Sequence, residues 1–441
     1  MKLAELSFSG LPPIDVPFRY FISAPLFIIA IAIMILFNDD PLWASRWQAA
    51  TLAITHAFTL GFMASIMMGA IYQLLPVTSG ISFPKPRLIA GFCHLFHTTG
   101  SVLLIVGFLT ANRLIQITAA LSLALGFSIY LYTLAYMFYK NKQKNVNNYT
   151  LKGIKLAFVA LLITVILGLL LQGKLAGLII IEWDRDLTNL HASWGLFAWV
   201  SILIISISFQ VIPMFYVAAE FHLRLKKYIS LSLFSSLIVM LLIKLAILPL
   251  YLQTVIQYIL LLIGAIYTFY LLKTINSRKR KISDTSINYW QLASISFLFI
   301  LITYAIPKHY LANIIENRAD LLFTAIFIFM VIVSILQGML LKILPFLVFT
   351  HLQQQCGMNF NAMQMLPKMQ DILCKPHASI LFTLHLISSI NLLTSIFYPQ
   401  WYWLFACALI VEFTWLTFLI AKAFYLYRLN YRKISSQITK I

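Results

Sequence analysis

Charged residues are scarce in this chain. Asp, Glu, Lys and Arg make up 10% of its 441 residues, whereas apolar and aromatic residues make up 61%. A soluble domain carries roughly 25% charged residues to cover its surface. A chain this apolar cannot form a polar shell in water, and the bilayer is the solvent that fits it. The composition therefore predicts an all-α polytopic membrane protein.

Several features of soluble enzymes are also missing. The four cysteines all fall on predicted spans or cytoplasmic loops, so no disulfide framework is implied. The longest predicted loop, roughly 349–376, is too short to bury a core of its own. Phosphate-cradling glycine loops and nucleophile elbows are absent. These absences exclude ordinary hydrolase and transferase chemistry in a soluble domain.

Long apolar runs fill the chain instead. A membrane-spanning helix needs about 20 mostly apolar residues. Twelve such runs are predicted, near 18–38, 51–75, 88–110, 114–139, 152–172, 189–213, 229–249, 253–273, 288–306, 320–348, 377–397 and 401–426. The first has no small-residue cleavage site and is predicted to be a retained helix. We expect residues 1–441 to form one integral membrane domain.

The net charge of +19 indicates orientation. If the N-terminus is cytoplasmic, 25 of the 32 Lys and Arg residues lie on the cytoplasmic side, and the acidic residues lean to the other side. This asymmetry follows the positive-inside rule and favours anionic lipid headgroups as neighbours. We therefore expect a multi-pass protein of a bacterial-type inner membrane with both termini cytoplasmic. A nucleic-acid partner is not expected.

Three predicted spans end in a similar motif. Each has a small residue, a polar residue four positions later, and a proline three positions after that: Gly69-x3-Gln73-Leu-Leu-Pro76, Ser206-x3-Gln210-Val-Ile-Pro213 and Gly338-x3-Lys342-Ile-Leu-Pro345. The small residue allows close helix approach, and the proline ends or bends the helix. The spacing predicts three parallel four-helix pseudo-repeats, roughly 1–145, 146–280 and 281–441.

Two of these spans also begin with a histidine. His56 precedes Gln73 by 17 residues, and His191 precedes Gln210 by 19. Both imidazoles are therefore expected in the outer, periplasmic third of the bilayer. A histidine within a span is costly unless it is paired, hydrated or coordinated. We interpret both residues as ligands of a metal or haem, with a structural or proton-handling role as the alternative.

A second group of candidate ligands lies on the cytoplasmic side. It follows the pattern His351-x4-Cys356-x17-Cys374-x2-His377. Imidazole and thiolate at such intervals can form a tetrahedral zinc site. The close ligand pairs of strong zinc motifs are missing, so an ordinary solvated loop is the alternative.

Other polar residues on or near spans need buried partners or an interface. They are Gln73, Gln210, Lys342, His94, His97, Glu412 and Lys244. Glu412 is the one acid deep within a predicted span, and Lys244 is the one base. The two are expected to pair with each other, or Glu412 to serve a proton path.

Taken together, this pattern resembles subunit I of the haem–copper oxidases and related nitric-oxide-responsive membrane haem proteins. Twelve spans in three four-helix units resemble that family along nearly the whole chain, but only residues 56–80 and 191–216 carry recognisable sequence. By resemblance, His56 would be a haem ligand and His191 a metal ligand. The resemblance implies a haem or copper cofactor and an association with respiratory-chain subunits.

The chain departs from the oxidases at the oxygen-reducing centre. The predicted seventh span lacks the close histidine pair that completes the copper site, and the predicted tenth span carries no histidine. A catalytic terminal oxidase is therefore not expected.

Two other functions stay open. One is a secondary transporter or metal permease whose kinked spans 2, 6 and 10 line a central path. The loop after span 2 does not match the major facilitator signature, and the repeat has four helices rather than six. The other is a non-catalytic assembly partner of a respiratory complex.

Overall fold

The computed structural model describes residues 10–37, 43, 45–141, 148–182, 184–279, 283–306 and 318–438. These residues form helices joined by short connections, with no strand among them. Twelve helical segments are long and apolar enough to cross a membrane, and each coincides with one of the predicted spans. The all-α, twelve-span prediction is confirmed. In a bilayer a helix satisfies its own backbone donors and acceptors, which is why such apolar runs fold in this way.

The described helices divide into two compact units, which we treat separately. In unit 1 the described residues are Leu95–Leu103 and 111–279, and in unit 2 they are 10–94, Leu104–Thr110 and 283–438, with the gaps given above. This division does not follow the boundaries of the three predicted repeats. That residues 1–441 form a single domain stays a prediction.

Unit 1 contains six helices in addition to the middle of α4 (Pro86–Thr110). They are α5 (Arg113–Lys140), α6 (Tyr149–Leu175), α7 (Asp184–Ser193), α8 (Ser201–Tyr216), α9 (Leu223–Lys244) and α10 (Leu252–Asn276), with the π-helical segment η3 (Trp194–Val200) joining α7 to α8. Polar N-caps start three of them: the Asn112 side chain accepts hydrogen bonds from backbone N–H groups of α5, that of Asn148 from one of α6, and that of His222 from one of α9.

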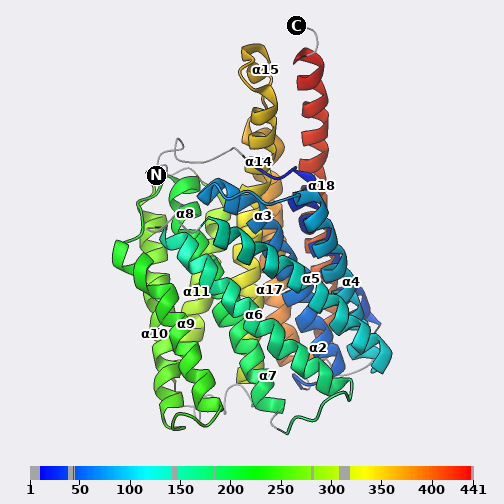
Figure 1. The fold of residues 1–441 in the computed structure, drawn as a ribbon, viewed down its shortest axis with the longest axis vertical. Helices are drawn as coiled ribbons and strands as arrows, with labels where there is room; N and C mark the ends of the chain where they lie inside the picture. Colours follow the sequence, from blue (N-terminus) through cyan, green and yellow to red (C-terminus); the bar gives the residue numbers. More distant parts are fainter. Residues whose placement is uncertain are drawn as a thin grey trace. The chain divides into compact units, whose positions relative to one another are not determined.

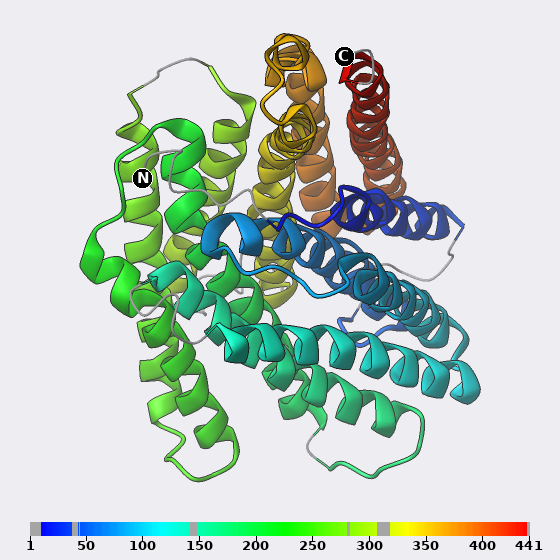
Figure 2. The ribbon, with the colours of Figure 1, turned by 45° about the horizontal axis from the view of Figure 1, so that its top comes forward.

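Unit 2 contains the remaining helices and the two ends of α4. They are α1 (Asp15–Leu36), α2 (Ala49–His56), η2 (Ala57–Ala64), α3 (Ser65–Ser79), α11 (Thr285–Ala305), α13 (Ala319–Ala325), η4 (Ile326–Val333), α14 (Ser334–Cys356), α15 (Phe360–Gln364), α16 (Met369–Ile372), α17 (Lys375–Phe397), η5 (Pro399–Trp401) and α18 (Tyr402–Ile438). α14 and α18 pack against each other, and α15 contacts both near their C-terminal ends (Figure 1 and Figure 2).

One helix pair recurs three times along the chain. α1 packs on η2 and α3, α6 packs on η3 and α8, and α11 packs on η4 and α14. The motif's small residue lies at each contact. A Cβ added to Gly69 would come within 2.8 Å of Tyr20, and one added to Gly338 within 2.7 Å of Tyr289. In the α6–α8 pair the small motif residue is Ser206, and the glycine is Gly153 on the partner helix α6: a Cβ on Gly153 would lie 1.9 Å from Ser206 Oγ.

The three second spans share a further feature. Each contains a π-helical segment of seven or eight residues, η2, η3 or η4, and each segment is followed by a serine: Ser65, Ser201 and Ser334. π-Helical segments are rare and often mark functional sites. Their recurrence at one position supports the predicted threefold repeat.

Two predicted helix ends are wrong. Pro345 does not close its helix, because α14 continues for eleven further residues to Cys356, and Phe346, Leu347 and Val348 are buried in the core. His351 is therefore part of α14. At the other site α9 ends at Lys244, which is its last residue and not an interior one.

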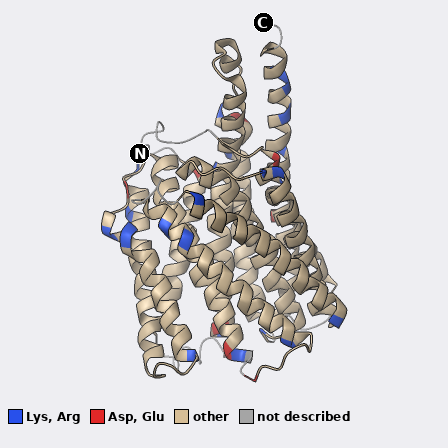
Figure 3. Ribbon diagram, in the orientation of Figure 1, with Lys and Arg blue, Asp and Glu red and all other residues tan. Residues whose placement is uncertain are grey.

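Basic side chains occupy the second half of α18. Lys422, Arg428, Arg432 and Lys433 all lie there, which Figure 3 shows as a run of blue. This placement agrees with the cytoplasmic C-terminus that the charge pattern predicts, although orientation stays a prediction.

The close approach at Gly338 gives a first testable expectation. Gly338→Ala would force α11 and α14 apart, because the new methyl group overlaps Tyr289. We expect a loss of about 1–3 kcal/mol in the free energy of unfolding, the usual cost of overpacking. Thermal unfolding in detergent would measure it. Gly173→Ala is the control, because its methyl group would meet only the flexible end of Ile179, at 3.3 Å. Equal stability of the two variants would contradict the close contact.

Candidate functional site

Unit 2 holds a chain of hydrogen-bonded polar side chains among its apolar helices. Tyr289 OH donates to Gln337 Oε1 at 2.9 Å, and Gln337 Nε2 donates to Glu412 Oε1 at 2.6 Å. His385 Nδ1 lies 2.7 Å from the same Glu412 oxygen, and His385 Nε2 lies 2.7 Å from Ser334 Oγ. Four helices, α11, α14, α17 and α18, contribute these five residues. We call them the buried polar chain.

Every member of the buried polar chain is withdrawn from the surface. The relative exposure of Glu412, His385, Gln337, Ser334 and Tyr289 is 0%. A carboxyl and an imidazole at this depth are expensive, and within membranes such groups usually pair and mark a site of function. Here the hydrogen bonds offset much of the desolvation cost. The compensation is incomplete, because Glu412 Oε2 has no hydrogen-bond partner among the described residues.

The predicted pairing of Glu412 with Lys244 is wrong. Glu412 is engaged with His385 and Gln337. Lys244 Nζ instead lies 2.9 Å from Asp186, a half-exposed carboxylate near the start of α7. The reason is the helix end: as the last residue of α9, Lys244 reaches an acidic group outside the apolar region.

A small cavity lies next to the buried polar chain in unit 2. Its volume is about 60 Å³, and its lining includes Thr51 and Thr55 of α2, Thr324 of α13 and Phe329 of η4. A water molecule needs roughly 10–15 Å³ of such space, so the cavity can hold a few. The buried Thr51 Oγ1 has no hydrogen-bond partner in the described part of the chain, which makes it an anchor for such water.

Phe329 lies at the cavity and packs on His385. Its ring lines the cavity, and its centroid is 4.8 Å from that of the His385 imidazole, with the two planes 33° apart. Phe329 also packs on Phe58 and Phe405. Phe329 is therefore in contact with both the cavity and the buried polar chain.

The two histidines predicted to bind a cofactor have a local feature in common. His56 Nδ1 lies 2.8 Å from Leu52 O, and His191 Nδ1 lies 3.0 Å from Thr164 O. A carbonyl can only accept, so Nδ1 is protonated in both neutral rings and Nε2 carries the lone pair. Metal-binding histidines are usually oriented in this way.

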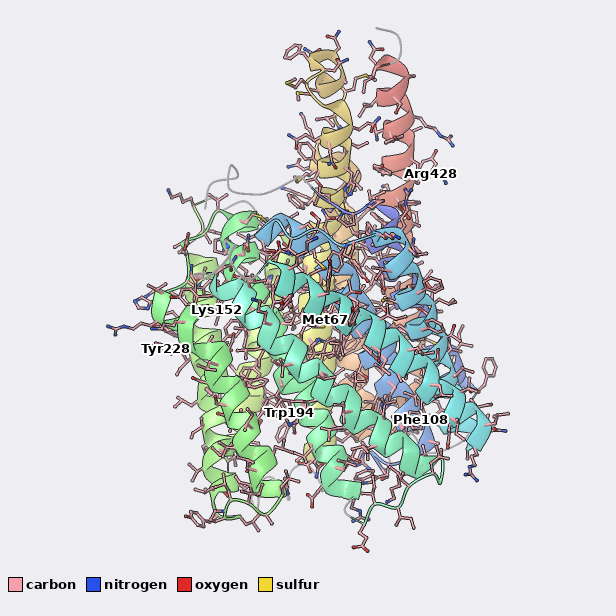
Figure 4. All side chains as sticks on the ribbon, viewed as in Figure 1. Met67, Phe108, Lys152, Trp194, Tyr228 and Arg428 are labelled. Atoms are coloured by element: carbon pink, nitrogen blue, oxygen red, sulfur yellow. The ribbon has the colours of Figure 1, made fainter. Side chains whose placement is uncertain are left out.

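The surroundings of the two rings are mostly apolar. His56 is the last residue of α2, and its ring packs on Phe108 of α4, labelled in Figure 4, with centroids 5.0 Å apart. His191 packs against α6, where a Cβ on Gly168 would come within 2.9 Å of the imidazole. Each ring precedes a π-helical segment, η2 or η3.

These donors suit some cofactors better than others. Haem iron accepts one or two axial imidazoles, so the donor chemistry of His56 and His191 fits it. A self-contained copper or zinc site needs a larger set, and no group of three or more His, Cys, Asp or Glu residues is gathered among the residues described here.

The predicted ligand group on the cytoplasmic side is not assembled. Both ring nitrogens of His351 lie 2.9 Å from backbone carbonyls, Nδ1 from that of Leu347 and Nε2 from that of Pro12. His377 Nδ1 lies 3.2 Å from Lys422 Nζ, and Cys356 is buried while Cys374 precedes α17. His351 thus ties the segment before α1 to α14, a structural task.

The polar residues of the repeated motif differ in the partners that their side chains have. Gln73 is 0% exposed, and neither its Oε1 nor its Nε2 has a hydrogen-bond partner in the described structure. Gln210 is also buried, with its Nε2 unpartnered among the described residues. Lys342 forms an ion pair with Asp284, the N-cap of α11.

The remaining histidines of this group occupy α4. His94 Nε2 lies 2.9 Å from Ser23 Oγ, and its ring meets Tyr20 edge-on at 4.9 Å. His97 is 0% exposed and packs on Phe127 with centroids 5.4 Å apart. Both were predicted as polar residues on the helix, and neither joins the buried polar chain described above.

Sequence reasoning identified Glu412 but missed its partners. The signal that could have found some of them is local: Ser334 and Gln337 are three residues apart, so they share a face of one helix. His385 is the one histidine well inside the eleventh span. That Tyr289, Gln337, Glu412 and His385 meet is a property of the packing of four helices.

Comparison with known proteins adds no family. No protein-family model matches the chain, and no curated protein matches it significantly.

The ion pair of Asp284 gives a second expectation. Partial burial raises the pKa of Asp284, but the Lys342 ammonium and hydrogen bonds from Ser286 outweigh it and hold that pKa below its ordinary value. A lowered pKa in the folded state stabilises the protein above the unfolded value of about 3.9, and this stabilisation is lost as the pH falls through the lower folded value.

Asp284→Asn keeps a capping side chain and removes the charge. We expect it to lower stability by about 1 kcal/mol at neutral pH and by much less near pH 3, as measured by thermal unfolding. Asp371→Asn, which alters an exposed carboxylate, is the control. A deficit of the same size at both pH values would argue against the ion pair.

Proposed function

We propose that this chain is an inner-membrane protein that binds a redox cofactor, preferably haem, near the predicted periplasmic face, and that His56 in unit 2 and His191 in unit 1 are each a ligand candidate within their own unit. The observation that carries the proposal is the tautomer of the two rings. In both, a backbone carbonyl 2.8 or 3.0 Å from Nδ1 leaves the lone pair on Nε2, the atom that ligates iron.

The chain's own residues would hold and orient the cofactor. The Leu52 and Thr164 carbonyls fix the ring orientation of His56 and His191, and Phe108 provides an aromatic wall beside His56. A haem held in this way would supply a one-electron couple or a gas-binding iron, suited to a redox or sensing role. The resemblance to haem–copper oxidase subunit I supports the proposal, as do the three repeated helix pairs.

Because oxidase ligands are missing, the proposed role does not include oxygen reduction. α9 and α14 lack the histidines that would complete an oxygen-reducing centre, apart from His351, whose nitrogens face carbonyls. We therefore propose electron transfer or sensing, with both termini cytoplasmic in a bacterial inner membrane. Respiratory-chain subunits are the proposed partners, and their co-purification with the full chain would support an assembly role.

The test is an optical spectrum with metal analysis. Purified full-length protein is expected to show a Soret band and about one iron per chain, and His56→Ala is expected to remove the band. His222→Ala is the matched control, because His222 is an exposed N-cap of α9. Loss of the band in His222→Ala, or a wild type with neither haem nor stoichiometric metal, would reject the proposal.

Transport is a second candidate, and one observation favours it. The cavity in unit 2 is lined by residues of the second and tenth spans, including Thr55 and Thr324, as expected for a path between kinked helices. A metal permease predicts an uptake defect in a deletion strain that one metal salt rescues.

A single variant can test the path. Ala325 lines the cavity, so Ala325→Phe is expected to fill it and to fail in rescuing uptake. Phe323 lies two residues earlier on the same helix but outside the lining, so Phe323→Ala is the control and is expected to keep rescue. Normal rescue by Ala325→Phe would count against a path through this cavity.

A further inference from the structure

We propose that His385 and Glu412 form a proton-binding centre, which exchanges one proton with the cavity beside α2 and α13 when the Phe329 ring moves aside. The ligand is the proton itself, delivered and removed by water in the cavity. The inference uses neither His56 nor His191, so it stands apart from the haem proposal.

The hydrogen bonds fix how many protons the centre holds. Ser334 Oγ donates to Met330 O at 2.8 Å, so its single hydrogen is committed. It must then accept from His385 Nε2–H. Glu412 Oε1 and His385 Nδ1, 2.7 Å apart, share one more proton between them. With no proton on Glu412 Oε2, the pair is neutral overall, whichever atom holds the shared proton.

Release of one proton has a defined route. The proton leaves from His385 Nε2 to a cavity water, and the Ser334 hydroxyl turns from Met330 O to donate to the vacated Nε2. The shared proton then stays on Nδ1, where it donates to the Glu412 carboxylate, and the centre carries one negative charge. Gln337 Nε2 keeps its hydrogen bond to Glu412 Oε1, which stabilises that charge. Uptake reverses these steps.

Two buried polar atoms at the centre have no hydrogen-bond partner in the described structure, so the observed arrangement of side chains does not satisfy all of its donors and acceptors. Glu412 Oε2 and Ser388 Oγ, the latter one turn from His385 on α17, are both buried and have no hydrogen-bond partner in the described structure. An unpaired buried polar atom lowers stability, because nothing compensates for the loss of its contacts with water. Each of these side chains could gain a hydrogen-bond partner by reorienting or by binding water. The centre is therefore suited to two protonation states.

Phe329 is placed to control access. It lies in η4, five residues before Ser334, and it contacts both the cavity and the His385 ring. The cavity holds a few waters at most, and its Thr51 hydroxyl is unpartnered within the described ranges. Displacement of one ring would join that water to Nε2.

Among the described residues that face the centre from α11, α14, η2 and η4, no charged side chain lacks an ion-pair partner. From α11 the facing titratable side chain is Tyr289, which donates to Gln337. From α14 the nearest charge is Lys342, about 7.5 Å along the axis from Gln337 and paired with Asp284. From η2, Phe62 packs on Phe413 of α18 at 5.2 Å. From η4 the facing residue is Phe329.

The first experiment follows the imidazole directly. Full-length protein with ¹⁵N-labelled histidine, in nanodiscs, gives nitrogen shifts for its nine histidines, and the His385 signals are those that His385→Gln removes. We expect the His385 shifts to change in a single step as the pH is varied. Glu412→Gln is expected to abolish that step. His385 shifts that do not change with pH in the wild type would overturn the proposal.

A pair of serine variants separates proton binding from packing. Ser334→Ala removes the partner of Nε2 and is expected to move the His385 step along the pH axis. Ser389→Ala is the matched control, because Ser389 is an equally buried serine whose hydroxyl donates to the His385 backbone carbonyl. In Ser389→Ala the His385 step is expected to occur at the same pH as in the wild type. An equal movement of the step in both variants would assign the effect to packing and reject the role of Ser334.

The second experiment tests the Phe329 ring. On transfer to D₂O, the exchange of the His385 ring protons is expected to be at least about tenfold faster in Phe329→Ala than in the wild type. Phe327→Ala is the control, because Phe327 lies in the same η4 segment and packs on Phe297, away from the cavity lining. Equal acceleration in both variants, or none in Phe329→Ala, would overturn the gating role.

Discussion

A polar side chain inside a membrane must find its partners within the protein, because lipid offers none. This constraint organises the core of unit 2. Glu412 on α18 cannot reach water, so α14 supplies Gln337 and α17 supplies His385, each within 2.7 Å. Those partners need partners in turn, and Tyr289 and Ser334 complete the chain. Four helices are thereby held in register by directional bonds, which apolar packing alone would not provide.

Close helix contact is what lets these short bonds form. α11 and α14 meet at Gly338, where even a methyl group would strike Tyr289. Gln337 precedes that glycine, and its amide accepts from Tyr289 across the same contact. The small residue of the repeated motif therefore serves the buried polar chain as well as the packing. Gly69 makes an equivalent contact with α1, where Tyr20 is the neighbour.

Much of the fold is predictable from the sequence because hydrophobicity is a local property. Twelve apolar runs became twelve helices, and the repeated motif led to three like helix pairs. Helix ends were less predictable: Pro345 lies inside α14, since burial of the residues after it outweighs one lost hydrogen bond. The partner of Glu412 could not be read from spacing, because His385 is 27 residues away and meets it through helix packing. For His56 and His191 the sequence indicates the residue type and depth, whereas the Nδ1–carbonyl contacts depend on the local backbone.

The three repeats place their ionisable groups differently around one common element. In the first two, a histidine stands before the π-helical segment, at His56 or His191. In the third, the corresponding position has no histidine, and the imidazole comes from α17 to meet Ser334, the residue just after η4. A π-helical segment holds one more residue per hydrogen-bonded ring than an α-helix and so turns the side chains that follow it. Phe329, within η4, contacts both the cavity and His385, and Ser334, just after η4, lies 2.7 Å from Nε2 of the same ring. The same backbone element thus follows a histidine of its own span in two repeats and is followed in the third by a serine that contacts a histidine of another helix.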